Sequence, residues 1–219
     1  YLLSLAPCVY PGYSTYLAAA AAGVIPPSGE SHPLFALCAR HVASLDYLSL
    51  PLRLNLFSAC CGTLCAVLFY YLVGRLILFS ACEDAGGAGR VDITENDGAQ
   101  EEEEASELPP EVTAYNRRMV PIAVTGGLIA AVLFTFTAAV WAASTRLDNG
   151  MFDLLIALVS LVLFPIGYPR FRLLRLLLSI FFFAIGLCES AAFLLLLPFY
   201  AYIVFNLLVF SPRRVVRVA

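Results

Sequence analysis

The sequence predicts an all-α fold, a polytopic helical membrane protein with four transmembrane helices and one or two short or half-spanning helices. Hydrophobic residues make up 61% of the 219 residues and charged residues only 13%, whereas about 25% of a soluble domain is charged. The charge is also concentrated, because 11 of the 16 acidic residues lie between Glu83 and Glu111. Lipid tolerates an apolar surface and excludes charge, so this pattern favours a membrane protein.

The apolar runs and polar breaks divide the chain into four parts. An N-terminal segment with a short membrane-associated helix, near Tyr16–Ile25, precedes a first transmembrane helix. That helix is long enough to cross a bilayer, because about 20 apolar residues span the hydrocarbon core. An acidic solvated loop and a helical membrane bundle with a basic C-terminus follow. The predicted boundaries are 1–53, 54–82, 83–118 and 119–219.

Three further spans are predicted in the bundle, at Val120–Ser144, Phe152–Tyr168 and Leu173–Leu197. Proline interrupts helices because it lacks an N–H and its ring clashes with the preceding turn. Pro198 is therefore expected to end the fourth span. The remaining run, Phe199–Phe210, has too few residues to cross a bilayer by itself, so it is predicted to be a half-span or an interfacial helix.

Arginines at the helix ends predict the topology. The positive-inside rule counts basic residues and largely ignores acidic ones. Most flanking arginines fall on the side of the acidic loop, which is therefore expected to face the cytoplasm, matrix or stroma. The same arginines are candidates for lipid-headgroup contacts, because guanidinium binds phosphate well. They are Arg117, Arg118, Arg170, Arg172, Arg175, Arg213 and Arg214.

A stripe of small residues runs along the second predicted span. Small side chains every fourth residue leave one helix face open to close approach by another helix in lipid. The partner helix can belong to this chain or to another subunit. The stripe consists of Ala123, Gly127, Ala131, Thr135, Ala139 and Ala143.

Glu189 is the one candidate ion or proton site, because it lies inside the fourth apolar run. An ionised carboxylate at that depth costs several kcal/mol, so it must be protonated, paired or beside water. A functional interpretation is a proton or ion site. A structural interpretation is a neutral carboxyl group that forms hydrogen bonds across a helix interface, assisted by Ser190.

No other chemistry is predicted. The two histidines, His32 and His41, precede the first clear span, and the seven cysteines lack the spacing of a zinc site or disulfide framework. No phosphate-binding glycine loop is present, and no cluster of His, Asp and Glu is expected. The sequence therefore predicts no catalytic residue, no metal and no cofactor, with bound lipid as the expected ligand.

These features predict a non-catalytic integral-membrane subunit of a larger complex, such as a respiratory-chain or ATP-synthase assembly in the mitochondrial inner membrane. Its expected partners are other membrane protein subunits and lipids, and no nucleic acid. The alternative is a small transporter or channel that uses Glu189. The acidic run is interpreted either as a solvated loop or as a docking surface for a basic partner.

Overall fold

The fold is known from a computed structural model, which describes residues 5, 7–8, 13–25, 32–88, 110–164 and 172–210. Within these ranges every element is helical, which confirms the all-α prediction. The elements are α1 (Tyr13–Ala21), α2 (Pro33–Ala43), α3 (Leu50–Ala88), α4 (Pro110–Phe136), α5 (Ala138–Thr145), α6 (Asn149–Leu163), α7 (Arg172–Glu189), the 3₁₀ helix η2 (Ala191–Leu196) and α8 (Leu197–Phe210).

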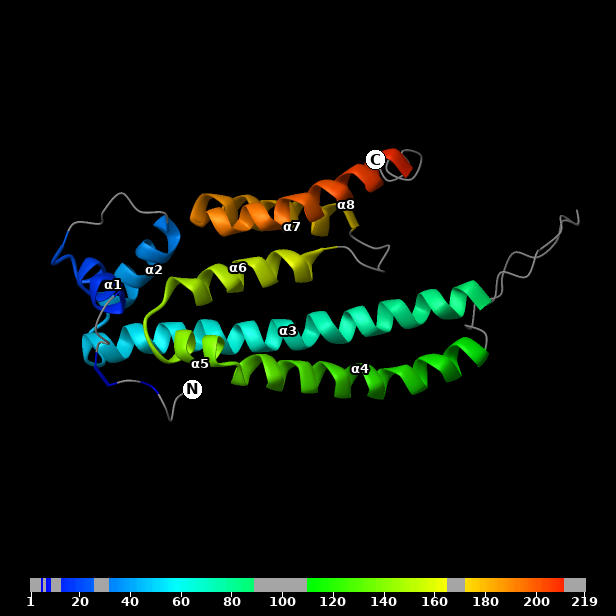
Figure 1. Cartoon of the computed structure of the whole chain (residues 1–219), viewed down its shortest axis with the longest axis horizontal. Coiled ribbons are helices and arrows are strands. Elements are labelled where there is room, and N and C mark those ends of the chain that lie inside the picture. Colours follow the sequence, from blue (N-terminus) through cyan, green and yellow to red (C-terminus); the bar gives the residue numbers. More distant parts are fainter. Residues whose placement is uncertain are drawn as a thin grey trace, which may run out of the picture.

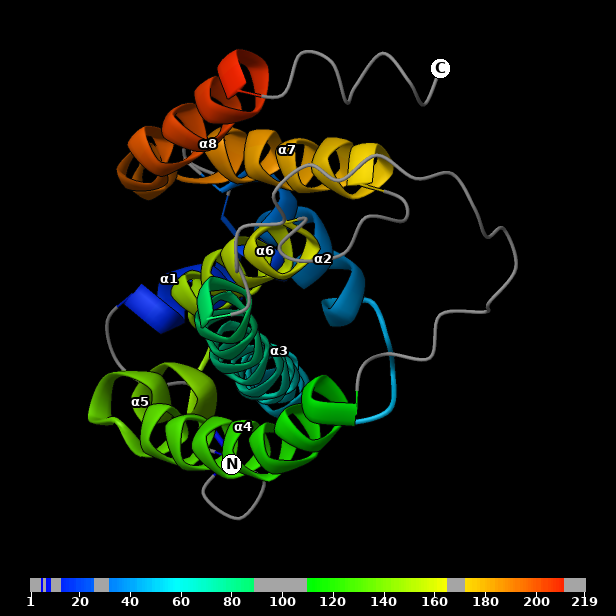
Figure 2. The ribbon, with the colours of Figure 1, turned by 90° about the vertical axis from the view of Figure 1, so that its right-hand side faces the viewer.

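The long helix α3 forms the centre of the molecule. Helices α4 and α6 pack on different sides of it, and α7 packs on the far side of α6 (Figures 1 and 2). Helices α1 and α2 lie at the end where α3 begins. Helix α7 runs back toward that same end (Figure 1). The chain therefore brings α2, the start of α6 and the end of α7 close together.

Two helices within the described ranges are long and apolar enough to cross a membrane, at Leu50–Ser80 in α3 and Met119–Phe136 in α4. In an 18-residue apolar stretch of each helix, only 28% and 17% of the stretch is buried in the protein. Leu128 and Leu133 of α4, for example, are more than half exposed. A soluble protein rarely exposes apolar patches of this extent, so the outer faces of α3 and α4 suit lipid.

The small-residue stripe packs inside the chain over its first three members. Ala123, Gly127 and Ala131 are buried on α4, which packs against α3. A Cβ atom at Gly127 would lie 3.0 Å from the carbonyl oxygen of Tyr70 on α3, which shows how closely the two backbones approach. The helix then ends at Phe136 and restarts as α5.

The later members of the stripe behave differently. Thr135 bonds within its own helix, through Oγ1 to the carbonyl oxygen of Ala131 at 2.6 Å. Ala139 is exposed, and Ala143 is half-buried on α5. The predicted single span 120–144 is thus two helices, because the extended backbone of Thr137 (ψ 138°) interrupts it.

The prediction of four membrane-spanning helices is supported only in part. Helix α6 has 15 residues, short of a full crossing. The fourth run divides at Ser190, not at Pro198. Ser190 is extended (ψ 136°) and its hydroxyl accepts a hydrogen bond from the Ala192 N–H. Pro198 lies in the first turn of α8, where a helix has no need of its missing N–H.

Helices α6, α7 and α8 share a core that contains a small buried hydrogen-bond network. The Ser179 hydroxyl donates to the carbonyl oxygen of Ser160 at 2.6 Å and lies 3.0 Å from the Tyr200 hydroxyl. The Tyr200 ring stacks on Phe183 with centroids 4.2 Å apart. This network fixes α7 between its two neighbours.

Most of the predicted lipid-headgroup arginines, and the middle of the predicted acidic loop 83–118, lie outside what the structure describes. The two ends of that loop, 83–88 and 110–118, belong to the helices α3 and α4. Residues 89–109 and Arg170, Arg213 and Arg214 fall outside the described ranges, as do the side chains of Arg117, Arg118 and Arg172. Arg175 is described and is half-buried on α7. The sidedness of the acidic loop remains a prediction.

Candidate functional site

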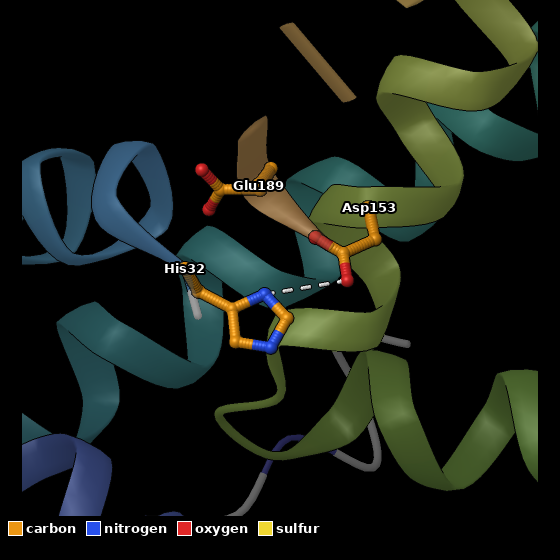
Figure 3. Close-up of side chains that lie close together, drawn as sticks. All are labelled: His32, Asp153 and Glu189. Atoms are coloured by element: carbon orange, nitrogen blue, oxygen red, sulfur yellow. Dashed lines mark ion pairs between the residues drawn. The ribbon is translucent and has the colours of Figure 1, made fainter. Parts of the chain in front are cut away.

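Three ionisable side chains from distant parts of the sequence meet at one end of the helical bundle. His32 precedes α2, Asp153 lies in the second turn of α6, and Glu189 is the last residue of α7. Figure 3 shows the three side chains converging from these elements. One ligand atom from each lies within 4.8 Å of the others. We call this group the polar cluster.

Glu189 binds the N-terminus of α2. Its Oε2 accepts a hydrogen bond from the Leu34 N–H at 2.8 Å, and its Oε1 accepts one from the Phe35 N–H at 2.7 Å. The first N–H groups of a helix have no partner within it, and His32 makes no side-chain cap of its own. The fully buried Glu189 therefore caps α2 from another part of the chain.

A close contact behind Glu189 fixes where α7 ends. A Cβ atom at Gly186 would lie 2.0 Å from the Phe193 ring, so only glycine lets this ring pack against the last turn of α7. The ring belongs to η2, which follows directly. The turn between α7 and η2 thus places Glu189 beneath α2.

Asp153 is positioned through the start of α6. The Asp148 side chain caps this helix by accepting a hydrogen bond from the Gly150 N–H at 2.7 Å. The preceding loop is tied to α3, because the Leu147 N–H donates to Oδ1 of Asn55 at 2.8 Å and the Asp148 N–H donates to Ser58 Oγ at 3.2 Å. These bonds fix the position of the first turns of α6.

His32 and Asp153 form a loose pair, with Nδ1 of His32 3.4 Å from Oδ2 of Asp153. Both side chains are 15% exposed. The imidazole Nδ1 and the other Asp153 oxygen, Oδ1, are buried and make no hydrogen bond. Buried polar atoms are nearly always paired, so this part of the cluster has unused binding capacity.

Burial raises the pKa of the Asp153 carboxyl group above its usual range. The nearby His32 opposes this shift, and the negative charge of Glu189 adds to it. Burial also raises the pKa of the Cys38 thiol on α2, with a smaller contribution from Glu189. Burial is thus the main influence on both groups.

A cavity of about 390 Å³ opens between α1 and α2 beside His32. Its wall is mostly apolar, with His32 and the guanidinium-bearing Arg40 as its charged or titratable members. His32 therefore links the buried cluster to a space large enough for part of a ligand.

The structure alters the sequence-based view of the site. Glu189 is polar and buried as expected, and it accepts hydrogen bonds across a helix interface. Both of its oxygens accept such a bond, from the first turn of α2. The expectation that no His, Asp and Glu would cluster is wrong. The sequence did contain one sign of a further site residue, because Asp153 is a second acid in an apolar run.

The fold and the site define a class: an all-helical chain with two helices of membrane-spanning length and a partly buried histidine–carboxylate cluster at one end. The chain belongs to the family of the protein O-mannosyl-transferase TMEM260 N-terminal domain, whose model matches residues 15–210. Neither a curated protein nor a solved structure matches the chain.

Family membership overturns the predicted function. This family is named for a transferase, so the expectation of a non-catalytic subunit is wrong, and the transporter alternative falls with it. The respiratory-chain and mitochondrial assignments lose their basis as well. The error arose because the candidate chemical groups are distributed over more than 150 residues of sequence. Groups so far apart form no local sequence motif.

Proposed function

We propose that this chain acts in the transfer of mannose to hydroxyl oxygens of proteins, the activity for which its family is named. The family match over residues 15–210 carries the proposal. The polar cluster beside the cavity supports it, because it combines the kinds of side chain that such a transfer requires.

The reaction has two chemical demands. The acceptor hydroxyl oxygen bonds to the anomeric carbon of mannose while the bond from that carbon to the leaving group breaks. The hydroxyl proton must be taken up, and the leaving group must be stabilised. Imidazole and carboxylate groups are common proton acceptors in enzymes. The polar cluster contains both, and His32 places it at the cavity wall.

Arg40 is suited to the second demand. It lines the same cavity as His32, and a guanidinium group binds phosphate through paired, charge-assisted hydrogen bonds. An anionic leaving group such as phosphate would fit there. The remaining wall is apolar, which suits a hydrocarbon carrier attached to that phosphate. The donor proposed from this cavity is therefore a lipid-carried mannosyl phosphate.

The membrane arrangement follows from α3 and α4, which we propose cross a bilayer, with lipids as the partners of their exposed faces. The polar cluster lies at the end where α3 begins. The described chain leaves α3 and enters α4 at the other end (Figure 1). The cluster and the end of α3 would then lie on opposite sides of the membrane.

A transfer assay tests the proposal. Purified protein in lipid nanodiscs is given a lipid-carried mannosyl phosphate and an acceptor protein, and mannose on serine and threonine is counted by mass spectrometry. Asp153→Asn is expected to reduce transfer by about 100-fold or more, the usual contribution of an acid–base group. The control is Asp46→Asn, an exposed acid outside the cluster. No transfer by the wild type, or full transfer by Asp153→Asn, would overturn the proposal.

A further inference from the structure

We propose that His32, Asp153 and Glu189 bind a divalent metal ion. This inference deepens the proposed function, on which it depends for what the ion would do. The binding itself stands on the geometry of the three side chains.

The first argument is convergence. An imidazole nitrogen and two carboxylate oxygens lie within 4.8 Å of one another. Ligand atoms around a metal ion with bonds of about 2.1 Å are separated by about 3.0 to 3.4 Å. The present spacing requires only small side-chain rotations to reach that distance. Three helix ends hold the ligands, so their backbones are already in position.

The second argument is the unused capacity of the cluster. Nδ1 of His32 and Oδ1 of Asp153 are buried without a hydrogen bond. The 3.4 Å separation of His32 Nδ1 from Asp153 Oδ2 is too long for a good hydrogen bond between them. Each oxygen of Glu189 has a second lone pair beyond the one that accepts from α2. A cation between the three residues would use all of these.

The third argument is charge. Two carboxylates lie side by side in a largely buried site, and in the parts of the chain that the structure describes neither pairs with an arginine. The N-terminus of α2 supplies only a fraction of a positive charge to Glu189. Buried carboxylates stay ionised only with a compensating partner, and a divalent cation would supply one for both.

The ligand set indicates the kind of ion. Imidazole favours transition metals, while carboxylates suit harder ions such as Mn²⁺. One imidazole with two carboxylates is therefore suited to Mn²⁺ or Zn²⁺ more than to Ca²⁺. The 15% exposure of His32 and Asp153 leaves a path of entry from the surface.

Pulsed electron paramagnetic resonance of bound Mn²⁺ tests the site. The full chain is stripped with a chelator and loaded with Mn²⁺, with no mannose donor present. Mn²⁺ avoids the seven cysteines, since thiolates prefer softer ions. A nitrogen modulation from coordinated imidazole separates this site from Mn²⁺ held by Glu101–Glu104, which offer oxygen only. Wild-type protein is expected to show this modulation.

Two variants complete the experiment. His32→Gln is expected to abolish the nitrogen modulation and to weaken Mn²⁺ binding at least about tenfold. The matched control, His41→Gln, changes the other histidine, which is exposed on α2, and should leave both unchanged. Absence of the modulation in the wild type, or its persistence in His32→Gln, would overturn the site.

Failure of the metal site and failure of the proposed function are separable. If chelator-treated protein still transfers mannose and shows no nitrogen modulation after loading, the metal site is wrong and the proposed transferase function stands. If the protein binds Mn²⁺ through His32 but transfers no mannose, the metal site stands and the proposed transferase function is wrong. The Mn²⁺ signal in the wild type depends on no substitution, so misfolding of a variant cannot decide the result.

Discussion

The α3–α4 pair and the polar cluster hold the chain together in opposite ways. Between α3 and α4 the backbones touch, as at Gly127 and Tyr70, and the span 119–136 contains no charged residue. At the cluster, three ionisable side chains join three elements. Dispersion forces need close packing, whereas charge-assisted hydrogen bonds connect elements through a few atoms. The comparison predicts that the two regions tolerate different substitutions.

The largest effect is expected from Glu189→Leu. This change leaves the Leu34 and Phe35 N–H groups buried without acceptors, and each unsatisfied group costs about 1 to 3 kcal/mol. We expect a loss of about 3 to 5 kcal/mol in the free energy of unfolding, measured by denaturant titration in detergent micelles. Glu189→Gln keeps one carbonyl acceptor and should lose roughly half as much. Equal losses in the two variants would argue against the capping role.

A medium effect is expected from Gly127→Ala. The new methyl group would lie 3.0 Å from the Tyr70 carbonyl oxygen and 3.2 Å from its ring, so α3 would have to shift by a few tenths of an ångström. Overpacking of this kind costs about 1 to 3 kcal/mol. Gly126→Ala is the matched control because it meets only the tip of the Ile77 side chain, which can rotate away. A smaller loss for Gly127→Ala than for Gly126→Ala would contradict the close backbone approach.

A smaller effect is expected from Ser179→Ala. The substitution removes the hydrogen bond to the Ser160 carbonyl oxygen and the contact with the Tyr200 hydroxyl. We expect the unfolding free energy to fall by about 1 kcal/mol, the usual value for one such bond. Thr125→Ala removes an exposed hydroxyl that bonds only within α4 and should change stability by less than about 0.5 kcal/mol.

The smallest effect on stability is expected from Leu128→Trp, on the exposed face of α4. Made in a Trp141→Phe background, it should shift the unfolding free energy by less than about 0.5 kcal/mol. Its fluorescence should nevertheless be quenched by lipids with brominated chains. Tyr47→Trp, at a position that is more exposed (83% against 57%) but outside both spans, should escape that quenching. Quenching of both, or of neither, would contradict a lipid-facing α4.

The fold could be predicted from the sequence further than the site could. The length of the apolar runs located α3 and α4. The small residues at every fourth position predicted a close helix contact, and Gly127 makes such a contact with α3. The breaks were harder to place. Ser190 ends the run before Pro198 does, because its hydroxyl can cap η2, and helix caps depend on local geometry that hydropathy does not record.

Glu189 was found because a carboxylate in an apolar run is conspicuous. Its bonds to Leu34 and Phe35 could not be anticipated, since they depend on how α7 returns across α6. Asp153 is also an acid in an apolar run, but nothing in the sequence placed it or His32 near Glu189. Helix α2 was also missed, although Pro33 at its first position is a typical helix start.

The capping of α2 by Glu189 has a consequence for how this protein is made. Leu34 and Glu189 are 155 residues apart, so a ribosome delivers the first turn of α2 long before its acceptor exists. Until α7 has been synthesised and has folded back onto α2, those N–H groups must bond to water or to another acceptor. The cluster is accordingly among the last features to be assembled during synthesis. An intact cluster therefore shows that the chain has been made and folded as far as η2.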